Sequence, residues 1–140
     1  MKNSSKTNKK VLNELALYFY PNSNLNNSTY LDFMGAEFNS YNPPTIHHIV
    51  KASTLREKNE SDAATIDNAA ILGDISHQLL HQIELIDKDL YDEWNDLFLR
   101  INQSRKEFYD DFKDEILDLQ FRSRLVLEEY EERKSSKHKK

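Results

Sequence analysis

The sequence contains no cysteine, and only two glycines and three prolines among its 140 residues. Without cysteine, disulfide bonds and thiolate zinc sites are excluded, so any bound metal must use histidine, carboxylate or water ligands. A cysteine-free chain is compatible with a reducing compartment. Because glycine and proline mark turns, their scarcity favours long helices over a sheet-rich fold.

Long apolar runs are also missing. No run approaches the roughly 20 residues of a membrane span. The N-terminus MKNSSKTNKK is basic, but the following residues include Asn13 and Glu14 and offer no small-residue cleavage site, so it is a poor signal peptide. We therefore expect a soluble, cytoplasmic protein without a membrane partner.

Positive charge is scarce in one large block. Residues 85–132 carry 7 Lys and Arg against 15 Asp and Glu, a net charge of -8, whereas residues 133–140 carry +5. Nucleic-acid binding depends on neutralising phosphates, so the acidic block cannot be the main nucleic-acid surface. That block suits a basic protein partner or mimicry of nucleic acid. The basic residues at the two ends of the chain remain candidates for phosphate contact.

Apolar residues at helical spacing predict a helix from Lys9 to Tyr20, closed by Pro21, after a disordered basic segment at 1–8. Residues 30–40 fit a short helix or a hairpin. Farther on, the pattern predicts one helix from near Ile75 to about Ile101.

A capping box at Ser104-Arg105-Lys106-Glu107 indicates that another helix begins there, although one bent continuous helix also fits. A narrow apolar stripe continues to Tyr130 through this charged segment. Plain helix packing is the first interpretation of the stripe, and self-association as a homodimer is the second. The acidic helical extension is expected at 87–134, followed by a disordered basic tail at 135–140.

Two short strands are expected between these helices. The Pro43-Pro44 pair forbids helix and leads into an extended segment, Thr45 to Val50, rich in β-branched residues. A second strand, Asn68 to Leu72, ends at the turn residue Gly73. Asp74 or Ser76 then suits the cap of the following helix.

Four of the five histidines fall in this central region. His77 and His81 are four residues apart, so a helix presents both on one face, one turn apart, as ligands of one ion must lie. His47 and His48 are adjacent on a strand, so their side chains point to opposite faces. One of that pair can bind metal while the other stays free to take a proton. The pattern predicts metal-assisted hydrolysis.

The order and spacing of these segments resemble the ββα-metal motif of the HNH nuclease family, in its colicin-type version with two helical histidines. The resemblance covers about residues 40–86. It rests on three segments: His47-His48-Ile49-Val50, Asn68-Ala69-Ala70-Ile71-Leu72 and Ile75-Ser76-His77-Gln78-Leu79-Leu80-His81. It implies a mainly α fold with a small β-hairpin, in which an HNH-like domain at 9–86 includes the N-terminal helix and precedes the long helical extension.

The resemblance implies a role for each residue. His47, His77 and His81 would hold one divalent metal ion, with Mg²⁺, Mn²⁺, Ni²⁺ and Zn²⁺ all open. His48 would be the general base, since a neutral imidazole near its reference pKa of about 6.5 is a competent base. Asn68 would hydrogen-bond backbone across the loop and hold the strand of His48 in register. The implied activity is endonuclease cleavage of DNA phosphodiester bonds.

Two departures from the family pattern concern scaffold and loop. Many members have a zinc-binding cysteine scaffold, which this chain lacks, so packing must hold the domain together. The glycine pair that commonly follows the first strand is also missing, and Glu57 to Ser61 occupy that loop. Lys51, Arg56 and Lys58 in the same loop are weak candidates for phosphate contact.

Two other functions remain open. A non-catalytic binding protein could keep the fold and engage a protein partner through acidic helices 87–132. A phage or mobile-element nuclease could require partner subunits, a context that comes from the resemblance alone.

Overall fold

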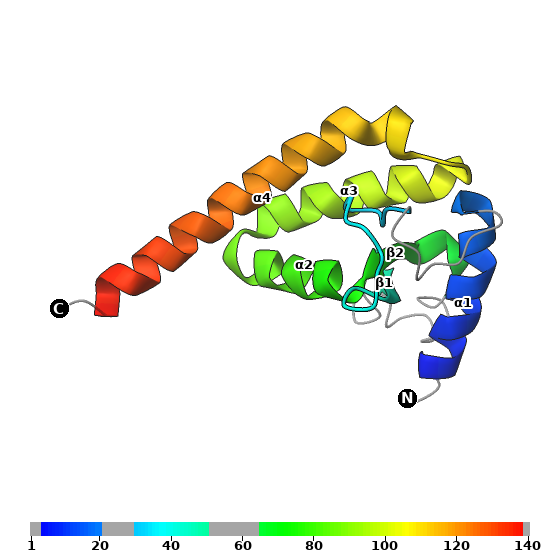
Figure 1. Ribbon diagram of the computed structural model, residues 1–140, viewed down its shortest axis with the longest axis horizontal. Helices are drawn as coiled ribbons and strands as arrows, with labels where there is room; N and C mark the ends of the chain where they lie inside the picture. Colours follow the sequence, from blue (N-terminus) through cyan, green and yellow to red (C-terminus); the bar gives the residue numbers. More distant parts are fainter. Residues whose placement is uncertain (1–3, 21–29, 51–64, 139–140) are drawn as a thin grey trace.

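The computed structural model describes residues 4–20, 30–50 and 65–138. In chain order the elements are α1 (Ser4–Phe19), β1 (Pro44–His48), the 3-10 turn η3 (Ile66–Asn68), β2 (Ala69–Gly73), α2 (Asp74–Ile86), α3 (Lys88–Ser104) and α4 (Tyr109–His138). The prediction of a mainly helical chain with one small hairpin is confirmed for these residues. Figure 1 shows the hairpin between α1 on one side and α2 on the other, with α3 running across.

The hairpin is antiparallel, and both strands lie within two residues of their predicted bounds. Its register places His47 opposite Ala70 and His48 opposite Ala69. Directly opposite residues share one face of a sheet. Because alanine has no side chain beyond Cβ, each imidazole has room beside its cross-strand neighbour.

The core is one cluster of buried apolar side chains to which all four helices and both strands contribute. At its aromatic centre, the Phe33 ring lies 5.1 Å from the Phe19 ring, 6.3 Å from the Phe98 ring and 5.2 Å from the Phe108 ring, between centroids. Such pairs each add roughly 0.5–1.5 kcal/mol beyond the area they bury. In a chain without cysteine, this packing joins the N-terminal helix to the hairpin and the later helices.

The expected single helix from Ile75 to about Ile101 is wrong in one respect, because it breaks at Asp87. The Asp87 backbone leaves the helical region, at φ -146° and ψ 89°, and its N–H donates to the carbonyl of Ile83 at the end of α2. Its carboxylate then accepts the Leu90 N–H at 3.1 Å and caps α3. Aspartate favours such caps over helix interiors. The break lets α3 pack against α2.

The start of α2 is capped differently from the prediction. Neither Asp74 nor Ser76 occupies the cap position, which belongs to Gly73 and has no side-chain hydrogen bond. Instead the Asn42 side chain reaches across from the preceding loop, and its Oδ1 accepts the Ile75 N–H at 2.7 Å. A Cβ atom built on Gly73 would lie 2.2 Å from that amide. The glycine is therefore required for the cap.

Residues 30–40, expected as a short helix or hairpin, form a loop closed by an isolated bridge between Leu31 and Glu37. The fully buried carboxylate of Asp32 organises this loop. It accepts hydrogen bonds from three backbone N–H groups, those of Met34, Ala36 and Gly73. Burial raises the pKa of Asp32, and the hydrogen bonds offset part of that rise. Asp32 thus fastens the loop to the end of β2.

The outer helices have different bounds from those predicted. α1 begins at Ser4, so the segment expected to be disordered is partly helical, and α4 continues to His138, into the expected tail. The capping box at Ser104 does not form. The Ser104 hydroxyl donates to the Ile101 carbonyl at 2.7 Å, and Arg105 turns into the left-handed region with φ 50°. α4 therefore begins at Tyr109.

α4 packs on α3 through both apolar and charged contacts. Phe108, Ile116 and Leu119 of the predicted stripe are buried in the common core, as the packing interpretation requires, and a homodimer stays a prediction. The Trp94 indole donates to the Ser123 hydroxyl at 2.9 Å. Two forked ion pairs also join the helices, Arg100 with Glu115 and Arg122 with Glu93. The C-terminal end of α4 extends beyond the other helices (Figure 1).

Within the described residues, no helix has both the length and the apolar content that crossing a membrane demands.

Candidate metal centre

Three of the singled-out histidines come together between β1 and α2. His47 lies on β1, and His77 and His81 lie one turn apart on α2. Between ring centroids, His47 is 5.5 Å from His77 and 6.2 Å from His81, and the two α2 rings stack 5.0 Å apart. The turn at Gly73 produces this arrangement by bringing the start of α2 back beside β1.

The three rings differ in exposure, from the interior outwards. His47 is buried, with 3% of its surface accessible, and its ring meets Tyr91 and Phe98 of α3 edge-on. His77 is half-buried, and His81 is exposed. The cluster therefore has an apolar floor and a side open to solvent.

Burial makes the inner two rings weaker bases. The pKa of His47 is lowered to about 4, chiefly by burial; the Asn95 hydrogen bond acts in the opposite direction, and the neighbouring histidines add to the lowering. The pKa of His77 is lowered first by burial and then by His81, with Asp74 acting in the opposite direction. Both rings are therefore neutral at physiological pH. Only a neutral imidazole has a lone pair for a metal.

Each ring of the cluster also contacts a side chain that can accept a hydrogen bond. His47 Nε2 lies 2.7 Å from Asn95 Oδ1, and His77 Nδ1 lies 3.0 Å from Thr45 Oγ1. His81 Nδ1 lies 3.4 Å from a carboxylate oxygen of Glu84. Metal-binding histidines commonly donate their second ring N–H to such groups.

The spacing of the rings suits three imidazole ligands of one ion. A metal about 2.1 Å from a ring nitrogen lies about 3.2 Å from the ring centre, so tetrahedral ligands have centres about 5.3 Å apart. The observed separations of 5.0 to 6.2 Å bracket this value. As the side chains stand, no set of three or more His, Asp or Glu groups in the described ranges is arranged to hold a metal ion. The ring centres are suitably spaced, whereas the side chains as they stand do not form a coordination sphere.

His48 lies on the opposite face of β1, towards α1. Its Nε2 is 3.1 Å from Oδ1 of Asn8, so the ring donates there and keeps Nδ1 as its free lone pair. Burial lowers the pKa of His48. A charge on His48 would lower the pKa of both His47 and His77, so it lies within electrostatic reach of the cluster.

Asn68 closes the hairpin beside His48. Its side-chain Oδ1 accepts the Val50 N–H at 2.8 Å, and its Nδ2 donates to the Val50 carbonyl at 2.9 Å. The Asn68 carbonyl also accepts the Ile49 N–H at 3.0 Å. These contacts cross the two ends of the 51–64 connection and hold the end of β1.

The turn that carries Asn68 is itself held by α3. The buried amide of Asn102 donates to the carbonyls of Ile66 and Ala69, at 2.7 Å each. Arg105 adds an ion pair with Asp67 at 2.6 Å. The backbone around Asn68 is therefore tied at both of its ends.

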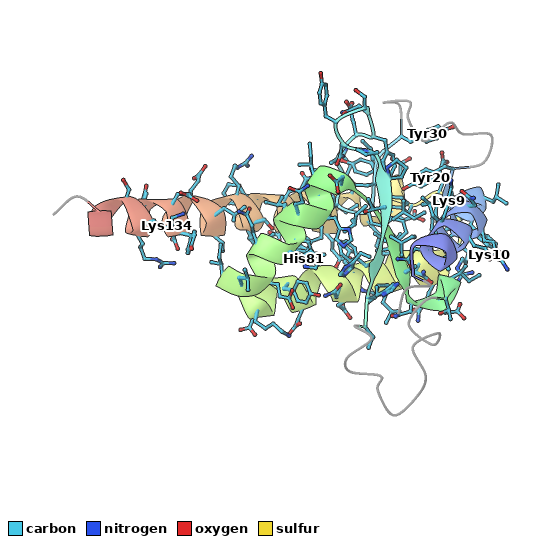
Figure 2. The ribbon with its side chains drawn as sticks, turned by 90° about the horizontal axis from the view of Figure 1, so that it is seen from below. Lys9, Lys10, Tyr20, Tyr30, His81 and Lys134 are labelled. Atoms are coloured by element: carbon cyan, nitrogen blue, oxygen red, sulfur yellow. The ribbon has the colours of Figure 1, made fainter. Side chains whose placement is uncertain are left out.

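The basic residues that are candidates for phosphate contact are described only in part. The predicted phosphate contacts, Lys51, Arg56 and Lys58, lie outside the described residues. Among the labelled side chains in Figure 2, Lys9 and Lys10 lie on α1, across the hairpin from His81. Lys134 lies near the far end of α4 (Figure 2).

Three residues at this site were not singled out by the sequence patterns: Thr45, Asn95 and Asn8. The sequence pattern could have indicated Asn95. Tyr91, Asn95 and Phe98 follow one another at helical spacing on one side of α3, so Asn95 is a polar residue on a largely apolar side of the helix. Nothing indicated Asn8, because it falls in a segment without a clear pattern. Contacts of this kind depend on tertiary packing.

No family model, curated protein or solved structure matches the chain.

Proposed function

We propose that the protein is a divalent-metal-dependent endonuclease that hydrolyses phosphodiester bonds of DNA. The observation that carries the proposal is the convergence of His47, His77 and His81 at ligand spacing, with the inner two rings neutral. The resemblance of residues 40–86 to the HNH motif supports the same reading, because the hairpin and helix occur in the expected order.

The donor set fits a divalent cation. Three neutral imidazoles would hold it, and His81 on the open side leaves access for a phosphate. A cation bound there would supply Lewis-acid stabilisation of the charge that develops on the phosphate and the leaving oxygen. Neutral ligands would leave the charge of the cation undiminished for that purpose.

His48 would act as the general base. Its lowered pKa keeps the imidazole neutral at physiological pH, with Nδ1 able to accept a proton from the attacking water. Asn68 would be a positioning residue, because it fastens the Val50 backbone two residues beyond His48. A small shift of that strand would move the base away from the attacking water.

The proposal is tested by nicking of supercoiled plasmid in the presence of Mg²⁺, Mn²⁺, Ni²⁺ or Zn²⁺, with EDTA as the metal-free reference. We expect nicking with at least one cation, and its loss in His48→Ala with metal binding retained. His47→Ala should lose both. A uniformly labelled RNA in a parallel reaction tests the choice of DNA. Intact plasmid under all four cations would overturn the proposal.

A matched control variant distinguishes a loss of catalysis from a loss of folding. Gln103 is exposed on α3, near the end of the helix that flanks the site, and nothing in the proposal involves it. Gln103→Ala should nick at the wild-type rate, whereas Asn68→Ala should lose most activity while retaining metal. Equal activity in Asn68→Ala and wild type would remove Asn68 from the mechanism.

The acidic outer faces of α3 and α4 support a second candidate, a non-catalytic protein that binds a basic partner. Asp110, Asp111 and Asp114 are exposed, so the surface is negative where a partner could reach it. Removing residues 104–140 would take Ile116 and Leu119 out of the core and expose the apolar side chains that pack against them, so charge substitution is the better test. Replacing the three aspartates by Asn should abolish a partner complex, with His48→Ala unaffected, if binding is the function.

A further inference from the structure

We propose that Asn95 and Thr45 select the tautomers of His47 and His77, so that the two rings offer different nitrogens to the metal, Nδ1 from His47 and Nε2 from His77. This inference rests on the proposed metal centre, and it concerns two residues outside the histidine pattern. Asn95 belongs to α3, and Thr45 precedes the histidine pair on β1. Both would be positioning residues.

The amide of Asn95 fixes the proton of the His47 ring. Its Oδ1 lies 2.7 Å from His47 Nε2, and an amide oxygen can only accept a hydrogen bond. The neutral form of an imidazole carries a single ring proton, and this contact places the proton of His47 on Nε2. The lone pair is then on Nδ1. Since 3% of the His47 surface is accessible, solvent offers little competition for this contact.

The hydroxyl of Thr45, which has a single proton, fixes the proton of the His77 ring. Thr45 Oγ1 donates to the carbonyl of Leu72 at 2.8 Å, across the hairpin. Its proton is then used, so Oγ1 must accept from the ring nitrogen 3.0 Å away, His77 Nδ1. The lone pair of neutral His77 is therefore on Nε2. The threonine is fixed by the register that pairs it with Leu72.

The two acceptors also limit how far each ring can turn. His47 is held by α3, and its ring meets Tyr91 and Phe98 edge-on. His77 is held by β1 through Thr45. A ligand held in one tautomer and one orientation pays less ordering cost on binding, and loss of such partners commonly weakens metal affinity by about 10- to 100-fold.

The direct test is the tautomeric state of each ring, read from long-range ¹H–¹⁵N correlation spectra of ¹⁵N-labelled full-length protein in EDTA at neutral pH. We expect His47 as the Nε2–H form and His77 as the Nδ1–H form. Asn95→Leu should convert His47 to a mixture, whereas Asn95→Asp, whose carboxylate still accepts, should preserve Nε2–H. Thr45→Val should release His77, and Thr45→Ser should keep its form. Unchanged tautomers in Asn95→Leu and Thr45→Val would overturn the inference.

Calorimetric titration with Ni²⁺ and Zn²⁺ gives the second readout. We expect Asn95→Leu to bind these metals about 10- to 100-fold more weakly than wild type. Asn95→Asp should regain most of the lost affinity. Asn102→Ala is the matched control, because it removes an asparagine of the same helix that contacts backbone carbonyls and no histidine. Equal weakening in Asn102→Ala would assign the effect to loosened packing and overturn the role of Asn95.

The two readouts separate this inference from the proposed function. If wild-type protein binds neither metal and nicks plasmid with none of the four cations, the proposed function fails, while the tautomer spectra still decide what Asn95 and Thr45 do to the rings. If wild-type protein binds metal and Asn95→Leu binds it equally well, the proposed function stands and the inference fails.

Discussion

Protonation of His47 should destabilise the fold as the pH falls. In the folded protein, burial among apolar side chains lowers the pKa of His47 to about 4, below the model-peptide value of 6.5 that applies in the unfolded chain. Between these values the unfolded state binds the proton more readily, so stability is full above about pH 6.5 and declines as the pH falls through about 4. Between pH 7 and pH 5, the two pKa values give a loss of about 2 kcal/mol from this ring.

The assay is urea unfolding followed by far-UV circular dichroism, at pH 7 and at pH 5, with EDTA present so that only protons compete for the ring. His47→Gln supplies the comparison, because glutamine is of similar length and does not titrate. The other titrating groups act in both proteins, so the free energy of unfolding of wild type should fall by about 2 kcal/mol more than that of His47→Gln. Equal losses would refute the claim that His47 is held neutral by burial.

Three further predictions concern the scaffold. Gly73→Ala should cost about 1–3 kcal/mol of unfolding free energy in urea denaturation, because the new Cβ meets the Asn42 cap; a neutral effect would show that Asn42 has free space to move. Asn102→Ala should lower the melting temperature, since the carbonyls of Ile66 and Ala69 both lose the Asn102 donor, at about 1–3 kcal/mol; a variant that melts like wild type would contradict this role. Arg122→Gln should cost at most about 1 kcal/mol, because its pair with Glu93 is exposed, and the loss should shrink in 1 M NaCl; a larger, salt-independent loss would point to packing instead of charge.

Local patterns were enough to predict the hairpin and its histidines. The proline pair before Thr45 excludes helix, and β-branched residues follow it, so β1 was readable within two residues. The i, i+4 spacing on α2 already implied that His77 and His81 share one face, and their rings stack. Periodicity within an element is a local property of the chain. For that reason the periodic pattern of the sequence is also found in the folded helix and strand.

What the sequence did not reveal depends on contacts between distant segments. The break at Asp87 arises because an aspartate can cap or continue a helix, and only the packing of α3 on α2 decides between them. The cap of α2 comes from Asn42, 33 residues before the N–H that it accepts. Likewise Asn95 is 48 residues from His47. No short-range pattern encodes a partner at such separations.

Helix α3 connects two parts of the candidate site mechanically. Asn95 contacts His47, and Asn102, about two turns farther along the same helix, holds the turn that carries Asn68. A helix of this length moves as a rod, so any displacement along its axis would shift both attachments together. The outer side of that rod bears Asp92 and Asp96, which are exposed. A molecule that bound this outer side and displaced α3 would therefore move the His47 ring and the strand that carries His48 together, without contacting either.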